Sequence, residues 1–477
     1  MKSRFAPLFA SIVLIPLLSV GFLNDDFIGL TKFAQRGWGL VLDQVHPKDF
    51  EFLRPLGFGL FTAEASVYGP RPWLFHATHL ALFVLAAWLA GTLAARIAGP
   101  AAAGWAVALA LLYPGRMEIV AWIAAAFDLV ALVLATVALL LATAPGWDSR
   151  RSPAVWLAVV CFLAPFAKES AFAIPAVVAT WELLGVLGPA PVRMRLLRCG
   201  SALAGACAAF ALRLTVLGGI GGYAGTSTAS AASRLLALPE ALGRVVLVPV
   251  NPTYSPASTL LAALCVVAVA AIAAGLLRAP AHAWTRPVMA GLTLALLGLL
   301  PALPYLDARV LVWRQSRFVA FAGLGVALAA ASALAAIPRR RSAVAGGVLV
   351  AVWAGVTLLN ELPWLGAARA REAMVAGIET ATRAPGEHVV WVAGPIDDYR
   401  GAQLVGGRLQ ELVALDLPAR HIRVDSEFLQ RRQHRLVGPP TAGPGEIPHV
   451  LQFDPSPPQL VPIDSWPPTG GGPPALR

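Results

Sequence analysis

Charged residues are scarce in this chain, because only 13% of its 477 residues are Asp, Glu, Lys or Arg. It has only four cysteines, and no two of them form a CxxC pair. A glycine-rich Walker loop, an HExxH motif and a CxxCH haem motif are all missing from the sequence. These absences argue against ATP hydrolysis, a structural zinc site and a disulfide framework.

What the sequence does contain is long apolar runs, with a hydrophobic share of 57%, a mean hydropathy of +0.69 and a net charge of +11. Nucleic-acid binding would require a basic patch interleaved with aromatic residues. Here Lys and Arg instead form short clusters between apolar stretches, which is the pattern of membrane topology signals. The composition therefore predicts a multi-pass membrane protein in contact with membrane lipids, with no nucleic-acid partner.

Stretches of about 20 apolar residues, the length that crosses a bilayer, predict an all-α polytopic membrane protein with about 11 transmembrane helices. They fall near residues 5–23, 73–95, 99–113, 118–143, 153–167, 170–188, 196–217, 259–277, 287–303, 318–337 and 343–362. We interpret the first as an uncleaved anchor, because it is longer than the apolar region of a secretory signal.

Three domains are expected. Residues 1–362 form the membrane domain, residues 363–453 form a small extracytoplasmic α/β module, and residues 454–477 form a Pro/Gly-rich tail. Within the module, the apolar run 389–392 predicts a buried strand and the spacing over 402–417 predicts a helix.

The basic clusters also predict orientation, because short cytoplasmic loops carry an excess of Lys and Arg. Alternate loops hold Lys2 and Arg4, Arg96, Arg150 and Arg151, Arg193, Arg195 and Arg198, Arg278 and Arg286, and Arg339 to Arg341. We therefore expect a protein of the plasma (inner) membrane with a cytoplasmic N-terminus and an extracytoplasmic C-terminal region. All the candidate site residues then fall on the outer face.

Two adjacent carboxylates, Asp25 and Asp26, lie where the first predicted helix leaves the membrane. Like charges at a bilayer edge repel each other and lose hydration, so such pairs typically persist because a proton, a metal or a cationic partner needs them. This acidic pair is the predicted reaction centre.

The first outward loop and the helix after it add three polar candidates. Arg54 is interpreted either as a lipid-headgroup anchor or as part of the site. His76 and His79 lie three residues apart on one face of the predicted second helix. There they either line an outward groove or make hydrogen bonds between helices.

The fourth predicted helix carries Arg116 and Glu118 at its mouth and Asp128 inside an otherwise apolar run. At about 1.5 Å per residue, Asp128 lies about 15 Å deeper than Glu118, where an unpaired carboxylate is costly. Asp128 therefore needs a partner. An arginine such as Arg213 would make the pair structural, and the alternative is a role in the site.

Further basic residues on the same predicted face suit phosphate. Lys168 either binds phosphate as a compact charge or forms an ordinary loop salt bridge with its neighbour Glu169. The loop 304–317 contains Arg314 and Arg317, whose guanidinium forks fit either phosphate oxygens or lipid headgroups.

Several short motifs occur in an order typical of one family: Asn24-Asp25-Asp26, Arg54-Pro55-Leu56, His76 with His79, Pro114 through Glu118 to Asp128, Lys168-Glu169, and Ser316-Arg317-Phe318. This order resembles the GT-C superfamily of polytopic glycosyltransferases. It is most similar to the membrane half of the tetratricopeptide-repeat-containing O-mannosyltransferases and their bacterial relatives. The likeness covers residues 5–340, and the chain departs from the family in lacking any repeat of about 34 residues after residue 362.

The resemblance implies an inverting transfer of a sugar, with mannose as one candidate, from a polyprenyl-phosphate donor to an extracytoplasmic protein, lipid or glycan acceptor. Asp25 or Asp26 would act as the base, and Lys168, Arg317 and Arg54 would bind the donor phosphate. Arg314 is a further phosphate-binding candidate from the loop 304–317, on the chemistry of its guanidinium alone. No cofactor is implied with certainty, and a divalent cation held by oxygen ligands is an open alternative.

Three other functions stay open at this stage. A lipid-sugar flippase or transporter would be expected to show internal repeats and polar groups near the midplane, and Asp128 is the main residue of that kind. A polysaccharide polymerase or ligase using a diphosphate-linked glycan would also employ outward arginines. A purely structural membrane scaffold is the third.

Overall fold

The computed structural model describes residues 10–44, 52–145, 147, 152–221, 231–247, 249–250, 257–278, 281–305, 315–433, 439 and 441–463. The chain forms two compact units. Residues 1–18 and 36–361 make the first, which we call the helical unit, and residues 19–35 and 362–477 make the second, which we call the sheet unit. The short segment 19–35 thus belongs with the C-terminal part of the chain, although the sequence placed residues 19–23 in the first transmembrane helix and residues 24–35 in the outward loop after it.

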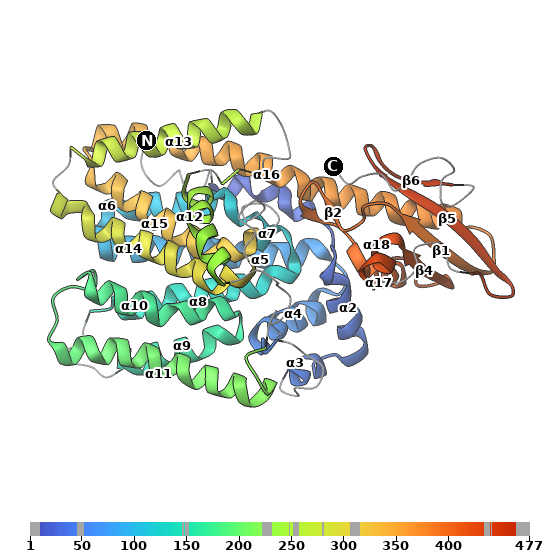
Figure 1. Ribbon diagram of the computed structural model, residues 1–477, viewed down its shortest axis with the longest axis horizontal. Helices are drawn as coiled ribbons and strands as arrows, with labels where there is room; N and C mark the ends of the chain where they lie inside the picture. Colours follow the sequence, from blue (N-terminus) through green and yellow to red (C-terminus); the bar gives the residue numbers. More distant parts are fainter. Residues whose placement is uncertain are drawn as a thin grey trace. The chain divides into compact units, whose positions relative to one another are not determined.

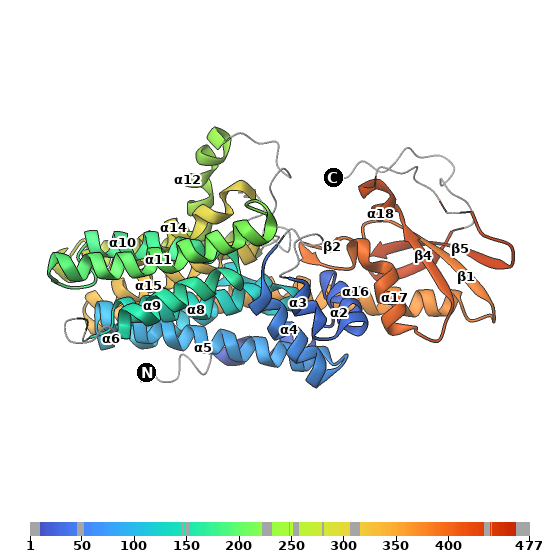
Figure 2. The same cartoon turned by 90° about the horizontal axis from the view of Figure 1, so that it is seen from below.

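The helical unit is built from apolar helices and short 3-10 turns (Figures 1 and 2). The elements are η1 (Ile15–Ser19), α3 (Gly39–Asp43), α4 (Pro55–Tyr68), α5 (Pro72–Ala98), α6 (Pro100–Leu112), η2 (Pro114–Arg116), α7 (Met117–Ala121), η3 (Ile123–Ala125), α8 (Ala126–Ala142), α9 (Ser152–Leu163), η4 (Ala164–Phe166), η5 (Glu169–Ala173), α10 (Ile174–Leu183), α11 (Val192–Leu217), α12 (Ala231–Leu247), α13 (Ala257–Leu276), α14 (Ala281–Leu299), η6 (Leu300–Tyr305), η7 (Ser316–Val319), α15 (Ala320–Ala336) and α16 (Arg339–Ala381). The boundary with the sheet unit falls inside α16.

Among the described residues, seven helices are long and apolar enough to cross a membrane, and three shorter apolar helices accompany them. This arrangement confirms the predicted polytopic all-α class. Two of the shorter helices, at Pro100–Leu112 and Ser152–Phe166, coincide with predicted spans that were shorter than the rest. Helices α4 and α12 were not predicted, because they lie in stretches that the hydropathy pattern assigned to outward loops.

Local sequence explains several helix boundaries and contacts. Helices α4, α5 and α6 each begin with proline, whose fixed φ and missing N–H suit the first helical position. Helices α14 and α15 approach closely through Gly291 and Gly325, since a Cβ on Gly291 would lie 2.6 Å from the carbonyl oxygen of Gly325. Small residues at such a crossing let the two backbones pack tightly within a membrane.

The sheet unit contains a four-stranded sheet in the order β4-β1-β5-β6. Its strands are β1 (Glu387–Ala393), β4 (Ile422–Ser426), β5 (Glu446–Pro455) and β6 (Pro458–Pro462), where β1 pairs in parallel with β4 and β5, and β6 is antiparallel to β5. A small hairpin, β2 (Asp398–Tyr399) with β3 (Ala402–Gln403), and the elements η8 (Gly406–Arg408), α17 (Leu409–Asp416) and α18 (Glu427–Arg432) connect the strands. Helix α2 (Asp25–Arg36) belongs to this unit except for its last residue.

The structure contains the predicted strand at 389–392 as the buried centre of β1. The predicted helix over 402–417 is corrected, because only Leu409–Asp416 is α-helical. Gly406 has a φ of +58°, a left-handed conformation that interrupts a helix. The predicted start of the tail at residue 454 is also too early, since the β5–β6 hairpin continues to Pro462. Residues 464–477 lie outside the described residues.

Candidate functional site

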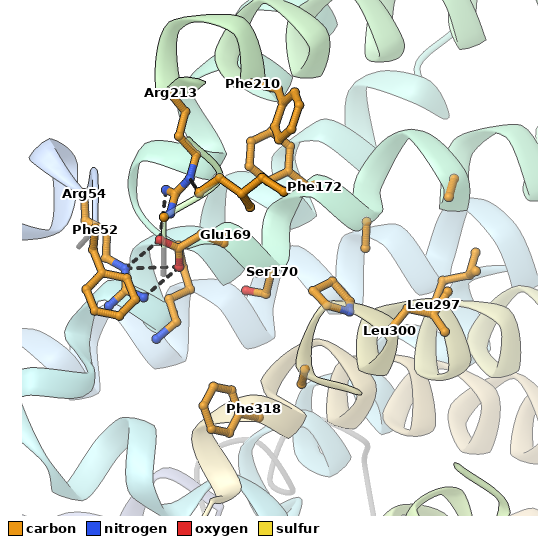
Figure 3. Close-up of a pocket in the computed structure, with 17 residues that line it drawn as sticks. Phe52, Arg54, Glu169, Ser170, Phe172, Phe210, Arg213, Leu297, Leu300 and Phe318 are labelled. Atoms are coloured by element: carbon orange, nitrogen blue, oxygen red, sulfur yellow. Dashed lines mark hydrogen bonds and ion pairs between the residues drawn. The ribbon is translucent and has the colours of Figure 1, made fainter. Parts of the chain in front are cut away.

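A cavity of about 520 Å³ opens in the helical unit and has one charged end and one apolar end (Figure 3). Arg54 comes from the residue preceding α4, Lys168 and Glu169 from the turn that begins η5, and Arg213 from the last turns of α11. The remaining lining is Phe52, Ser170, Phe172, Ala173, Ala176, Phe210, Ile220, Gly221, Leu297, Leu300, Pro301, Ala302 and Phe318. The cavity is therefore amphipathic, as a site for a lipid with a charged head would be.

Glu169 is the centre of the charged end, and Figure 3 shows Arg54 and Arg213 converging on its carboxylate. Arg54 donates from Nε to Oε1 at 3.0 Å and from Nη2 to Oε2 at 2.7 Å, while Arg213 donates from Nη1 to Oε1 at 3.0 Å. Burial alone raises the pKa of Glu169, but the charge and hydrogen bonds of Arg54, with the charges of Lys168 and Arg213, lower it to about 2. Glu169 is therefore ionised at any physiological pH.

Lys168 turns away from its sequence neighbour and pairs with Asp128. Its Nζ lies 3.1 Å from Asp128 Oδ2, and both side chains are buried. The predicted alternatives for these residues are thus corrected twice: Asp128 has Lys168 rather than Arg213 as its partner, and Glu169 bonds to arginines of two distant segments rather than to Lys168. Asp128 itself is not part of the cavity lining.

The charges of the cavity do not cancel. Within the part of the chain that the structure describes, its lining holds three cations, Arg54, Lys168 and Arg213, against one carboxylate, Glu169. When Asp128 behind Lys168 is included, three cations still face two carboxylates. An excess of positive charge in a poorly hydrated place favours the binding of an anion.

A second ion pair joins the buried Glu118 and the partly buried Arg317 outside the cavity. The Arg317 backbone N–H donates to Glu118 Oε2 at 2.9 Å, the Arg317 guanidinium pairs with Oε1, and the Glu118 N–H donates to Ser316 Oγ at 3.0 Å. Phe318, the next residue, does line the cavity, and its ring lies 4.8 Å from Arg317 Cζ and 5.7 Å from Lys168 Nζ. Arg317 therefore supports the cavity wall without lining it, and Arg314 lies outside the described residues.

The other candidates of the helical unit are buried away from the cavity lining. His79 Nε2 lies 3.2 Å from a Glu64 carboxylate oxygen, which links α5 to α4 as the helix–helix interpretation expected. His76 is buried on the same helix. The Arg116 guanidinium is buried beside the rings of Phe83 and Tyr113, at 4.7 and 5.6 Å from Cζ. All three residues are therefore buried among other parts of the helical unit and do not line the cavity.

The acidic pair belongs to the sheet unit, and its two carboxylates have different environments. Asp26 is 1% exposed, and its Oδ2 accepts a hydrogen bond from the Leu23 N–H at 2.8 Å. The Asp25 side chain is 49% exposed and lies 3.4 Å from Arg408 Nε. Both residues occupy the first turn of α2, where the helix dipole favours negative charge. They are therefore not interchangeable, which the sequence did not reveal.

The sequence missed Arg213 as a cavity residue and missed Glu64 as the partner of His79. A usable signal existed for each, because a charged residue in an apolar helix needs a compensating partner. Phe52, whose ring lies 4.0 Å from Arg54 Cζ, gave no such signal. Within the described ranges, no group of three or more His, Cys, Asp or Glu side chains is arranged to hold a metal ion.

No protein family model and no curated protein matches the chain. Solved structures similar to it include ArnT from Cupriavidus metallidurans bound to undecaprenyl phosphate, with 17% identity, a TM-score of 0.43, and coverage of 88% of this chain and 89% of that one. An oligosaccharyltransferase from Archaeoglobus fulgidus in complex with Zn and sulfate is 14% identical, with a TM-score of 0.44 and coverage of 86% of this chain and 61% of that one. The chain thus spans about three fifths of the archaeal enzyme.

The identities and TM-scores are low, so the likeness carries no argument about chemistry. The function has to be argued from the residues of this chain.

Proposed function

We propose that the chain is a membrane glycosyltransferase that takes a sugar from a polyprenyl-phosphate donor and passes it to an extracytoplasmic acceptor. The observation that carries this proposal is the amphipathic cavity of the helical unit. Its charged end, with Arg54, Lys168 and Arg213, supplies donors for phosphate oxygens. Its apolar end, with side chains such as Leu297 and Leu300, suits the first isoprene units of a lipid tail.

The charge balance of the cavity favours a donor with a single phosphate. A sugar linked to a lipid through one phosphate is a diester with about one negative charge, whereas a diphosphate link carries about two. Among the described residues, the three cations and two carboxylates of this site leave an excess of one positive charge. A polymerase or ligase that uses a diphosphate-linked glycan would need further cations.

The proposed sugar transfer requires a proton acceptor and cations from the protein. The acceptor hydroxyl attacks the anomeric carbon, the bond from that carbon to the phosphate oxygen breaks, and the leaving phosphate takes the electron pair. A carboxylate accepts the hydroxyl proton, while Lys and Arg stabilise the charge that develops on phosphate. Attack opposite the leaving group inverts the anomeric centre.

Of the two candidate carboxylates, we assign the base to Asp25 and a structural role to Asp26. A base has to reach the acceptor hydroxyl, and about half of the Asp25 side chain is exposed. Asp26 is 1% exposed and its carboxylate is engaged by the Leu23 N–H. The base and the phosphate site are assigned from the residues of each unit separately.

The positions of the basic clusters in the helical unit support the orientation that we propose for the chain in the membrane. The first turns of α16 and of α11, which carry predicted cytoplasmic clusters, lie at the same end of the unit (left in Figure 1). Helix α4 and the last turns of α11, which contribute to the cavity, lie at the other end. By the positive-inside rule, we place the N-terminus in the cytoplasm and the cavity at the extracytoplasmic end.

The test uses the full chain in lipid nanodiscs or proteoliposomes, supplied with polyprenyl-phosphate sugars. We expect wild-type protein and Asp26→Asn to transfer sugar, and Asp25→Asn to lose at least about 100-fold in kcat, the scale of general base catalysis. Full transfer by Asp25→Asn contradicts the base assignment. Movement of the lipid-linked sugar across vesicles without formation of a glycosidic bond would instead favour a flippase.

A further inference from the structure

We propose that the C-terminal part of the chain contributes a positioning residue, Arg408, to the reaction. This inference rests on the proposed function, because it concerns the carboxylate assigned there as the base. In it, Arg408 and the segment around it hold Asp25 in the orientation needed for proton transfer. The C-terminal part would then contribute directly to catalysis.

The first observation concerns the acidic turn, by which we mean residues 24–26 at the start of α2. This turn is hydrogen-bonded to a segment almost 400 residues away in the sequence. The Asn24 N–H donates to the Leu404 carbonyl at 2.8 Å, and Asn24 Nδ2 donates to Gln403 Oε1 at 2.7 Å. Asn24 has a φ of +45°, a left-handed conformation that asparagine tolerates better than most residues. The backbone at the start of α2 is therefore fixed by two hydrogen bonds from a single residue.

The second observation is that the segment on the other side of these bonds is itself anchored. The Leu404 N–H donates to Asp397 O at 3.2 Å, and the N–H groups of Val405 and Gly406 both donate to Ile396 O, at 3.0 and 2.6 Å. Leu404, Val405 and Ile396 are fully buried. Arg408 thus projects from a turn that is tied to the end of β1.

The third observation is how Arg408 meets the acidic turn. Its Nε lies 3.4 Å from Asp25 Oδ1, and its Nη1 lies 3.9 Å from Glu411 Oε1. Among the described residues, Arg408 is the only side chain that pairs with Asp25. Because the guanidinium is within ion-pair distance of Glu411 as well as of Asp25, Arg408 is restrained from two contacts, and this restraint would orient the Asp25 carboxylate.

An exposed ion pair of this kind contributes little to folding, typically about 0–1 kcal/mol. A positioned base, in contrast, affects the rate steeply, since a small misplacement of a reacting group costs up to about 100-fold. A positioning role therefore predicts a loss of kcat that is out of proportion to any loss of stability. That difference separates it from a purely structural ion pair.

The experiment compares Arg408→Gln, Arg408→Lys and Arg423→Gln in the full chain. Arg423 is the matched control, because it forms an exposed ion pair with Glu446 in the same unit. We expect Arg408→Gln to lower kcat by about 10- to 100-fold with KM for the donor and Tm unchanged, and Arg408→Lys to recover part of that loss. Arg423→Gln should keep wild-type kcat.

Two results would overturn the inference: an Arg408→Gln enzyme as active as Arg423→Gln, or a loss of activity matched by a loss of Tm in both Arg408 variants. A second measurement is independent of activity. In a chain without its native cysteines, Asn24→Cys with Gln403→Cys should form a disulfide on mild oxidation, whereas Asn24→Cys with Arg423→Cys should not. Absence of the first crosslink also overturns the inference. Crosslinking together with a fully active Asp25→Asn enzyme means instead that the base assignment has failed while the contact stands.

Discussion

The cavity of the helical unit and the acidic turn of the sheet unit both gather charge, but they hold it in different ways. In the cavity, Arg54, Lys168 and Arg213 are at least nine-tenths buried, and they and the carboxylates hold one another through side-chain ion pairs. At the acidic turn, backbone hydrogen bonds fix the chain and leave Asp25 half-exposed. Removing one charge should therefore disturb the fold in the cavity, but mainly the chemistry at the turn.

The largest effect is expected for Glu169→Gln. This change leaves two buried guanidinium groups without their common counter-ion, and breaking a buried pair in this way costs about 3 kcal/mol or more. Thermal unfolding in detergent should show a clearly lower Tm. Glu240→Gln is the matched control, since its pair with Arg244 is exposed and should shift Tm very little. Equal Tm values for both variants would contradict the expectation that the ion pairs of the cavity stabilise the fold.

The next effect concerns ligand binding in the cavity. Lys168→Gln removes a cation from the lining, but the glutamine amide can still donate a hydrogen bond to its partner Asp128, so the fold should be disturbed less than by Glu169→Gln. We expect binding of a polyprenyl phosphate to weaken by about 10- to 100-fold, measured by titration in nanodiscs. Arg317→Gln provides the contrast, because Arg317 does not line the cavity. It should lower stability and leave the affinity within about threefold of wild type. If Arg317→Gln lost affinity and Lys168→Gln did not, phosphate binding would have to be assigned to Arg317 instead of Lys168.

A smaller effect is expected at the acidic turn. Asp26→Asn keeps an oxygen acceptor for the Leu23 N–H but removes its charge from the first turn of α2, which costs about 1 kcal/mol. Asp25→Asn should leave Tm almost unchanged, because the one side chain that pairs with Asp25 among the described residues is the partly exposed Arg408. For kcat we expect the opposite order, with a larger loss in Asp25→Asn than in Asp26→Asn. If Asp26→Asn were the less active and more stable variant, the roles of the two residues would be exchanged.

The sequence was informative where local pattern decides structure. Apolar stretches located the membrane helices, and the run at 389–392 located the central strand, because both signals are contained within a few turns or residues. The rule that a buried charge needs a partner correctly required one for Asp128. Sequence alone could not choose between Arg213 and Lys168, because both lie far from Asp128 along the chain and only packing brings Lys168 to it. The link from Asn24 to Gln403 was equally hidden, since no local pattern encodes a pairing across 379 positions.

The smallest expected effect is a difference in how the two units respond to acid. Burial and the neighbouring His388 lower the pKa of His449, whose Nε2 lies 3.0 Å from His388 Nδ1 between β5 and β1. The unfolded chain then takes up this proton first, so the contribution of His449 is complete above its ordinary pKa of 6.5 and is lost as the pH falls below it. For Glu169 the contribution is complete above 4.5 and is lost only toward a pH of about 2.

Between pH 6.5 and 4.5, these two groups therefore weaken only the sheet unit. Hydrogen exchange at pH 7 and pH 5, corrected for intrinsic rates, should show faster opening of β1 and β5 at pH 5, while peptides from η5 and the end of α11 keep their protection. His449→Asn should remove the difference in the strands. If the cavity peptides opened together with the strands, or if His449→Asn kept the full pH response, the acid sensitivity would have to be assigned to other groups.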